Sequence, residues 1–75
     1  MNVKELLGKE VLDVHGDKIG KVADLDVDML HAVINHVILK SGLTKKYNIK
    51  VDEIVTIGDK VILRTGADEL RKRVE

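Results

Sequence analysis

The residues best placed to do chemistry are three aspartates that alternate with apolar residues, namely Asp24, Asp26 and Asp28. Their spacing resembles the opening of a calcium-binding EF-hand loop, but that loop requires glycine at position six and glutamate at position twelve. Counted from Asp24, those positions hold Met29 and Asn35. The alternation instead predicts a strand with an acidic polar face. This face is a candidate binding surface for a basic partner, with loose association of a cation as the alternative.

Apart from carboxylates, the three histidines are the only candidate metal ligands, because the chain has no cysteine. His15 and His31 fall in predicted turns, whereas His36 shares one face of a predicted strand with Ile34 and Ile38. A zinc site would require all three histidines to converge and to keep partners in a second layer. We therefore expect no metal site and no cofactor, and we expect His36 at a packed interface.

A basic stretch follows, in which Lys40, Lys45, Lys46 and Lys50 occur without any acidic residue between the first and the last. Such lysines often keep an edge strand soluble. They could also contact RNA phosphates or an acidic protein. The formal net charge of zero and the single aromatic residue, Tyr47, argue against a general RNA binder.

The sequence offers little material for catalysis. Ser41 is the only serine and has no histidine near it in sequence. A nucleophile elbow and a phosphate-binding glycine loop are both missing. We therefore expect no catalytic residues and no enzymatic activity.

Length and composition bound the architecture that must position these residues. A chain of 75 residues forms a single domain, here spanning residues 1–75, with a small core and a thin margin of stability. It has neither a signal peptide nor an apolar run long enough for a membrane span. Together with the lack of cysteine, this leads us to expect a cytoplasmic protein.

Valine occurs 11 times and isoleucine seven times, and these β-branched residues favour strands. Turn residues divide the chain into short strands, predicted over residues 10–14, 19–28, 32–40, 47–51, 54–57 and 60–64. The pattern predicts an all-β fold, a small bent antiparallel barrel of five to six strands over residues 8–65. A helical turn over residues 2–7, capped by Asn2, and a short helix over residues 66–74 flank it. The second helix has a narrow apolar stripe of Ala67, Leu70 and Val74.

Two glycines and the apolar pattern give finer expectations. We expect Gly16 to have a positive φ in the first turn, and Gly20 to mark a β-bulge. Ten apolar residues are predicted to be mostly buried: Val11, Val22, Leu25, Val27, Val37, Leu39, Val51, Ile57, Val61 and Leu63.

The predicted third strand is apolar on both faces. One face starts at Val33 and can fill the barrel, whereas the other carries Ile34, His36 and Ile38 and would be exposed on a monomer. Pairing of two copies would bury this second face and enlarge the small core. We therefore expect a homodimer or larger homo-oligomer, with a monomer capped by the terminal helices as the alternative.

Two ordered segments of the chain resemble PRC-barrel domains. The first contains Gly8-Lys9-Glu10-Val11, Asp13, Gly16, Ile19-Gly20-Lys21-Val22, Asp24-Leu25 and Val27-Asp28. The second contains Ile49-Lys50-Val51-Asp52-Glu53-Ile54, Ile57-Gly58-Asp59 and Val61-Ile62-Leu63. One departure is Lys50, where many relatives carry proline before the acidic turn. The short form of the chain resembles the standalone archaeal members.

The resemblance implies a six-stranded β-barrel module used for assembly. Family members resemble the cytoplasmic domain of the photosynthetic reaction-centre H subunit and the C-terminal domain of a ribosome maturation factor, and standalone archaeal members include adaptors of cell division. It implies a non-enzymatic adaptor that binds another protein and self-associates, in cell division or another assembly. The alternative is a factor in RNA processing or ribosome maturation that uses the stretch from Lys40 to Lys50. A small-ligand or metal-binding barrel is a third hypothesis.

Overall fold

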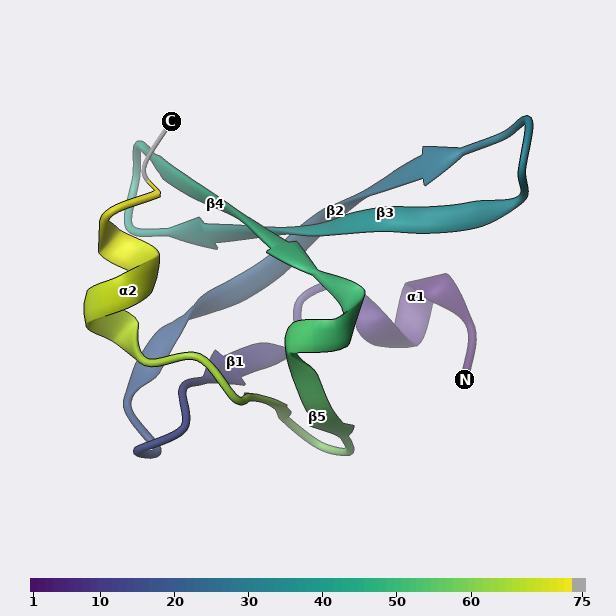
Figure 1. Ribbon diagram of the computed structural model, residues 1–75. Coiled ribbons are helices and arrows are strands. Elements are labelled where there is room, and N and C mark those ends of the chain that lie inside the picture. The colour runs from purple at the N-terminus through teal and green to yellow at the C-terminus, as the bar shows by residue number, and fades with distance from the viewer. Residues whose placement is uncertain (74–75) are drawn as a thin grey trace.

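The computed structural model describes residues 1–73 and confirms a mainly β architecture with two short helices (Figure 1). The strands are β1 (Glu10–Leu12), β2 (Lys18–Asp28), β3 (Val33–Ser41), β4 (Lys45–Lys50), β5 (Ile54–Ile57) and β6 (Val61–Leu63). The helices are α1 (Val3–Leu6) and α2 (Ala67–Arg71), and the 3-10 turn η1 (Val51–Glu53) joins β4 to β5. Val74, which was predicted to extend the last helix, lies outside the described residues.

All six strands form one bent sheet in the order β4-β3-β2-β1-β6-β5. The sheet is barrel-like but not closed, because β4 and β5 remain at its two edges. Every strand pair is antiparallel except β1 with β6, which pair in parallel. This parallel pair departs from the predicted antiparallel barrel. The strand β6 lies between β5 and β1 in the sheet, antiparallel to β5 and parallel to β1.

Three bulges bend the long strands β2 and β3. Ile19 is the extra residue where β2 pairs with β1, and Ala23 is the extra residue where it pairs with β3. Asn35 is the extra residue in β3 itself. A bulge inserts one residue into one strand only, so it reverses which later side chains point inward. The bulge at Ala23 therefore lets Val22 and Leu25 face the same side of the sheet despite their odd spacing.

Gly16 and Gly20 serve the fold in different ways. Gly16 has φ of +84°, as predicted for the turn between β1 and β2. Gly20 lies next to the bulged residue Ile19, and a Cβ atom at this position would overlap with the carbonyl oxygen of Lys40. Gly20 is therefore required because β3 passes too close to β2 to leave room for a side chain.

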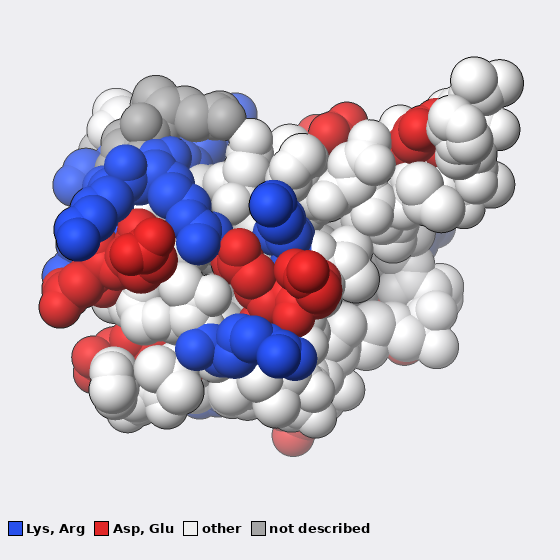
Figure 2. All heavy atoms as spheres, in the orientation of Figure 1, with Lys and Arg blue, Asp and Glu red and all other residues white. Residues whose placement is uncertain are grey.

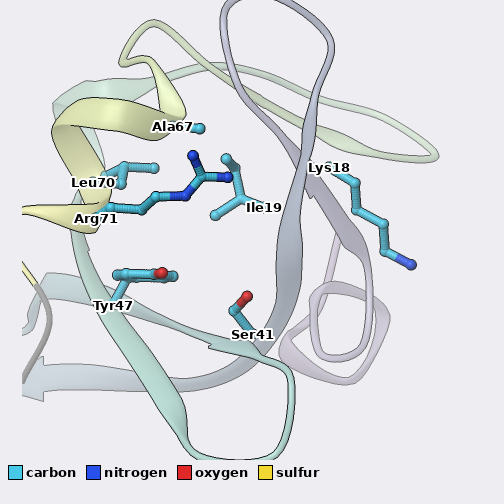
Figure 3. A pocket seen from close by; sticks show the side chains of 7 residues that line it. All are labelled: Lys18, Ile19, Ser41, Tyr47, Ala67, Leu70 and Arg71. Atoms are coloured by element: carbon cyan, nitrogen blue, oxygen red, sulfur yellow. The ribbon is translucent and has the colours of Figure 1, made fainter.

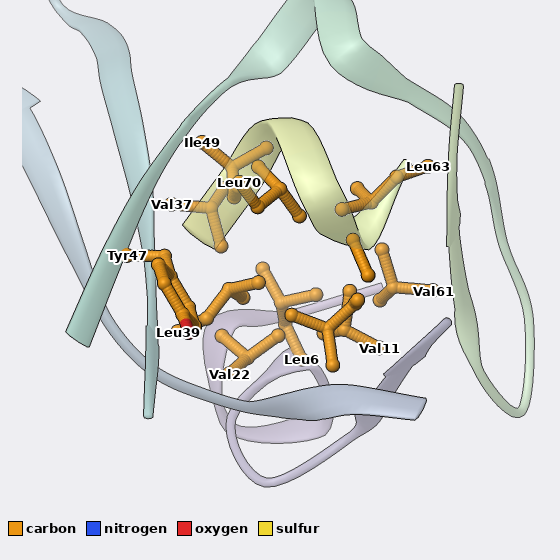
Figure 4. Packing of buried hydrophobic residues seen from close by; sticks show 12 residues of the cluster. Leu6, Val11, Val22, Val37, Leu39, Tyr47, Ile49, Val61, Leu63 and Leu70 are labelled. Carbon is orange, nitrogen blue, oxygen red and sulfur yellow. The ribbon is translucent and has the colours of Figure 1, made fainter. Parts of the chain in front are cut away.

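The buried core lies between the curved sheet and the two helices, as Figure 4 shows. Its twelve members are Leu6, Val11, Ile19, Val22, Val37, Leu39, Tyr47, Ile49, Val61, Leu63, Ala67 and Leu70. Six of the ten predicted core residues belong to this set, namely Val11, Val22, Val37, Leu39, Val61 and Leu63. Leu25 is half-buried and packs against the core.

The prediction was wrong for Val27, Val51 and Ile57, which are all more than 40% exposed. Val27 lies on a hairpin that extends past the core, Val51 belongs to the 3-10 turn, and Ile57 lies on an edge strand. The open ends of the sheet are instead filled by residues from the two helices. Leu6 from α1 and Leu70 from α2 are both buried.

Asp13 is the only buried charged residue among those described, with 1% of its surface exposed. One carboxylate oxygen accepts hydrogen bonds from the backbone N–H groups of His15 and Asp17, at 2.9 and 2.8 Å. The other accepts from the N–H of Ala67, at 2.9 Å, at the start of α2. Asp13 therefore ties the β1–β2 turn to the C-terminal helix, a role that the sequence alone did not reveal.

We expect Asp13→Asn to lower the melting temperature and to weaken its dependence on acid. Burial raises the pKa of Asp13, but the N–H donors of Ala67, Asp17 and His15 outweigh this effect and leave the pKa below its ordinary value. The ionised carboxylate therefore stabilises the fold above its unfolded pKa of about 3.9, and this stabilisation is lost as the pH falls through the lower folded value.

Thermal unfolding at neutral pH and near pH 3 measures this contribution. The wild type should lose more melting temperature on acidification than Asp13→Asn, and the variant should melt about 5–15 °C lower at neutral pH. Asp17→Asn, at an exposed aspartate of the same turn, is the matched control. An equal acid response of wild type and Asp13→Asn would contradict the assignment.

Candidate interaction surfaces

The hairpin of β2 and β3 projects from the body of the protein as an arm, visible at the upper right of Figure 1. We define the arm as residues 25–35. β1 pairs with β2 only as far as Lys21, and β4 pairs with β3 only from His36 onward. Within the arm, the two strands therefore pair only with each other.

The tip of the arm is shaped by Asp28. One oxygen of its carboxylate accepts hydrogen bonds from the N–H groups of Leu30 and His31, at 3.0 and 3.1 Å. The other lies 2.7 Å from Nδ1 of His31, and this side-chain contact, with the backbone donors, holds the pKa of Asp28 below its ordinary value. Ala32 closes the turn with φ of +55°. Asp28, predicted to bind a partner, is thus engaged within the turn itself.

The arm and the segment around α1 expose several large apolar side chains. Met29 and Leu30 at the tip are 84% and 87% exposed. Behind the tip, a groove of about 210 Å³ separates the arm from the N-terminal segment. It is lined by Met1, Asn2, Val3, Leu6, Leu25 and Ile34. Figure 2 shows the arm at the upper right as a largely uncharged projection with red aspartates near it.

The bulge at Asn35 divides the predicted self-association face. Residues directly opposite each other in a strand pair share a face, and Ile34 lies opposite Val27 whereas His36 lies opposite Asp26. Because Asp26 and Val27 are neighbours on β2, they point to opposite sides of the sheet. Ile34 therefore lines the groove, and the prediction that it shares a face with His36 and Ile38 was wrong. The simple alternation assumed a strand without an extra residue.

The opposite side of β2, β3 and β4 forms a second surface, which we call the outer face. It is arranged in three cross-strand rows, according to the pairing of the strands. The rows are Lys21–Lys40–Lys46, Asp24–Ile38–Asn48 and Asp26–His36–Lys50. The outer face thus has a basic end, a half-buried Ile38 at its centre and aspartates along β2.

Most of the predicted partner-binding residues meet on this outer face. Asp24, Asp26, Lys40, Lys46 and Lys50 all belong to it and are exposed. Nδ1 of His36 lies 3.2 Å from a carboxylate oxygen of Asp26. Lys45 lies opposite Ser41 at the start of β4 and alternates with Lys46, so it points away from the outer face.

The serine considered for catalysis lines a cavity of only about 50 Å³ beneath α2. Figure 3 shows the side chain of Arg71 extending from α2 across this cavity, with Tyr47 and Ser41 on its other side. Small-molecule sites are usually several times larger, about 300–1,000 Å³. Within residues 1–73, no group of three His, Cys, Asp or Glu residues is placed to hold a metal ion.

None of the helices in the described part of the chain is long and apolar enough to cross a membrane. Residues 1–73 form a small, bent β-sheet module with two candidate contact surfaces, and its two larger hollows, of about 330 and 310 Å³, are open at the surface. The described pockets are open surface hollows or the small cavity beneath α2.

The model of one protein family matches almost the whole chain. The PRC-barrel domain model covers residues 1–70, so the chain belongs to the PRC-barrel domain family. This match includes both segments of the sequence resemblance and adds the N-terminal helix and the start of α2. PRC-barrel domains are small β modules that often occur in protein-interaction contexts. No curated protein matches the chain.

Proposed function

We propose that this chain is a non-enzymatic cytoplasmic adaptor that binds another protein and self-associates within a macromolecular assembly such as the cell-division machinery. The observation that supports protein binding most strongly is the exposed apolar arm beside the groove. Soluble monomers rarely expose large contiguous apolar patches unless the patch binds something. The pairing of β2 with β3 keeps the arm extended, so its apolar tip is presented to a partner.

The chemistry of the arm indicates the kind of partner it suits. From Val22 to Leu39 the chain contains three aspartates and no lysine or arginine. These aspartates point away from the groove or bind within the turn at the tip, so they do not line the groove. A partner segment that places apolar side chains in the groove would complement its apolar lining. We therefore propose that the arm docks an apolar protein segment.

The RNA-binding alternative has one observation in its favour, which is the row of Lys21, Lys40 and Lys46 on the outer face. Single-stranded RNA is usually also held by aromatic side chains that stack on its bases. Tyr47, the only aromatic residue, is 4% exposed and belongs to the core. The adaptor is therefore the better supported function.

A change of one leucine at the tip of the arm tests the adaptor function. We expect Leu30→Lys to abolish recovery of a protein partner from nuclease-treated native lysate, because a charge at the tip opposes apolar docking. Leu43→Lys is the matched control, since Leu43 is 94% exposed in the other hairpin turn, between β3 and β4. Partner recovery is quantified by mass spectrometry of the bound proteins.

The control should recover the same partner as the wild type. Equal recovery by Leu30→Lys would contradict the role of the arm, and loss of the bound material on nuclease treatment would favour the RNA alternative. Circular dichroism of both variants verifies that the fold is intact.

A further inference from the structure

We infer that the outer face binds a second copy of this chain, through a two-fold interface in which the lysine row of each copy meets the aspartates of the other. The inference rests on the proposed self-association and names the surface that performs it. It depends on the charges and strand register of β2, β3 and β4, and Asp26 is the only residue that this interface shares with the arm.

The lysine row is unfavourable within a single copy. Lys21, Lys40 and Lys46 lie directly opposite one another on three neighbouring strands, and like charges in such positions repel. Within residues 1–73, none of their ammonium groups forms an ion pair with a carboxylate. Glu10 on β1 lies opposite Lys21, but its carboxylate is 3.7 Å from the ammonium group of Lys18 instead. An acidic partner surface would relieve this repulsion.

The aspartates of the same face supply the complementary charge. Asp24 and Asp26 are exposed on β2, at one side of the half-buried Ile38. The carboxylate of Asp24 accepts the N–H of Leu25, and Asp26 contacts His36. Both therefore keep carboxylate oxygens available to lysine side chains of another molecule.

The spacing of the strands allows both contacts to form at once. Neighbouring strands are about 4.8 Å apart, and residues on one face of a strand are separated by about 6.7 Å. Consider a two-fold axis that lies between the outer faces of two copies and parallel to both faces. It passes over Ile38 of β3 and runs oblique to the strands. It places Asp26 of each copy over Lys46 of the other, and Asp24 beside Lys40. Ile38 of both copies then meets at the centre, which is the arrangement of an isologous dimer.

A pair of charge-reversed variants tests this interface. Lys40→Glu with Lys46→Glu leaves only acidic side chains at the two proposed contacts, and Asp24→Lys with Asp26→Lys leaves only lysines there. Each variant alone should dimerise at least about tenfold more weakly than the wild type, because like charges now face each other. A mixture of the two should restore dimers as heterodimers, since both contacts become attractive again. Light scattering on a size-exclusion column measures the mass at about 100 µM, where a dimer with a Kd of about 10 µM is mostly associated.

A control separates this specific contact from general attraction between oppositely charged molecules. Lys4→Glu with Lys60→Glu changes the net charge by the same amount at exposed positions outside the outer face. It should dimerise like the wild type, and mixing it with the basic variant should not produce heterodimers. Circular dichroism of each variant confirms the folded state.

The outcomes distinguish this inference from the proposed function. A wild type that dimerises but does not respond to either reversal overturns the outer-face interface and leaves self-association standing. A wild-type monomer at this concentration overturns both self-association and the interface, while the arm experiment still decides partner binding. Loss of self-association on raising the salt from about 50 to about 500 mM supports the charged contact. Binding of an RNA oligonucleotide by the lysine row, with no dimer, assigns the row to the RNA alternative instead.

Discussion

Leu39→Ala is expected to lower the free energy of unfolding by about 2–5 kcal/mol, the usual cost of a large-to-small change in a packed core. Leu39 is 1% exposed and lies on β3, opposite Val22 on one side and Tyr47 on the other. Figure 4 shows its side chain directed into the cluster beside these two residues. Shortening it therefore leaves a cavity at the centre of the sheet.

For a chain of this length the loss is a large share of the total stability, which is about 4–11 kcal/mol at typical values per residue. Denaturant unfolding followed by circular dichroism measures it. A graded series provides the controls. Leu25→Ala, at a half-buried position, should lower the free energy of unfolding by less than Leu39→Ala does. Leu43→Ala, at a position that is 94% exposed, should change it by less than about 0.5 kcal/mol. Equal midpoints for the Leu39 and Leu43 variants would show that β3 is not oriented as described.

Gly20→Ala is expected to destabilise the protein by about 1–3 kcal/mol or more, although it adds a single methyl group. Its Cβ would overlap with the carbonyl oxygen of Lys40 and would lie 3.3 Å from Cα of Ser41. Both obstacles are backbone atoms of a central strand, so they cannot rotate away as a flexible side chain would. Relief of the overlap requires β2 and β3 to separate.

Gly58→Ala is the matched control for this prediction. Neither Gly20 nor Gly58 has a positive φ, and a Cβ on Gly58 would meet no atom within 4 Å. Gly58→Ala should therefore be neutral or stabilise by roughly 0.4–1 kcal/mol, because it restricts the unfolded chain. Melting temperatures of the two variants compare them directly. A Gly20→Ala variant as stable as Gly58→Ala would rule out the close approach of β3.

Much of the strand content could be read from the residues. The abundance of valine and isoleucine and the position of turn residues predicted six strands, two terminal helical segments and the positive φ of Gly16. Local rules suffice for these features, because strand alternation and turn conformation depend on residues within a few positions of each other. The family also followed from the order of short motifs along the chain.

The two candidate surfaces could be predicted only in part. The sequence predicted Asp24, Asp26, Lys40, Lys46 and Lys50 as candidate binding residues, but it did not indicate that strand pairing brings them onto one outer face. Lys21 was not singled out because its place in the lysine row comes from lying opposite Lys40, 19 positions away in the chain. The buried Asp13 was missed for the same kind of reason, since one of its donors is the N–H of Ala67.

The sequence by itself determined the class of fold and the residues able to form strands. Only the tertiary structure decided which side of each strand is buried. A bulge at Ala23 and another at Asn35 reverse the alternation within β2 and β3, and they move Ile34 from the predicted interface to the groove. A local pattern of period two does not show where a bulge occurs, because the position of the extra residue depends on the register between two paired strands. The exposure of Val27 has a similar cause: the arm extends past the core, and the extent of a core is a property of the whole chain.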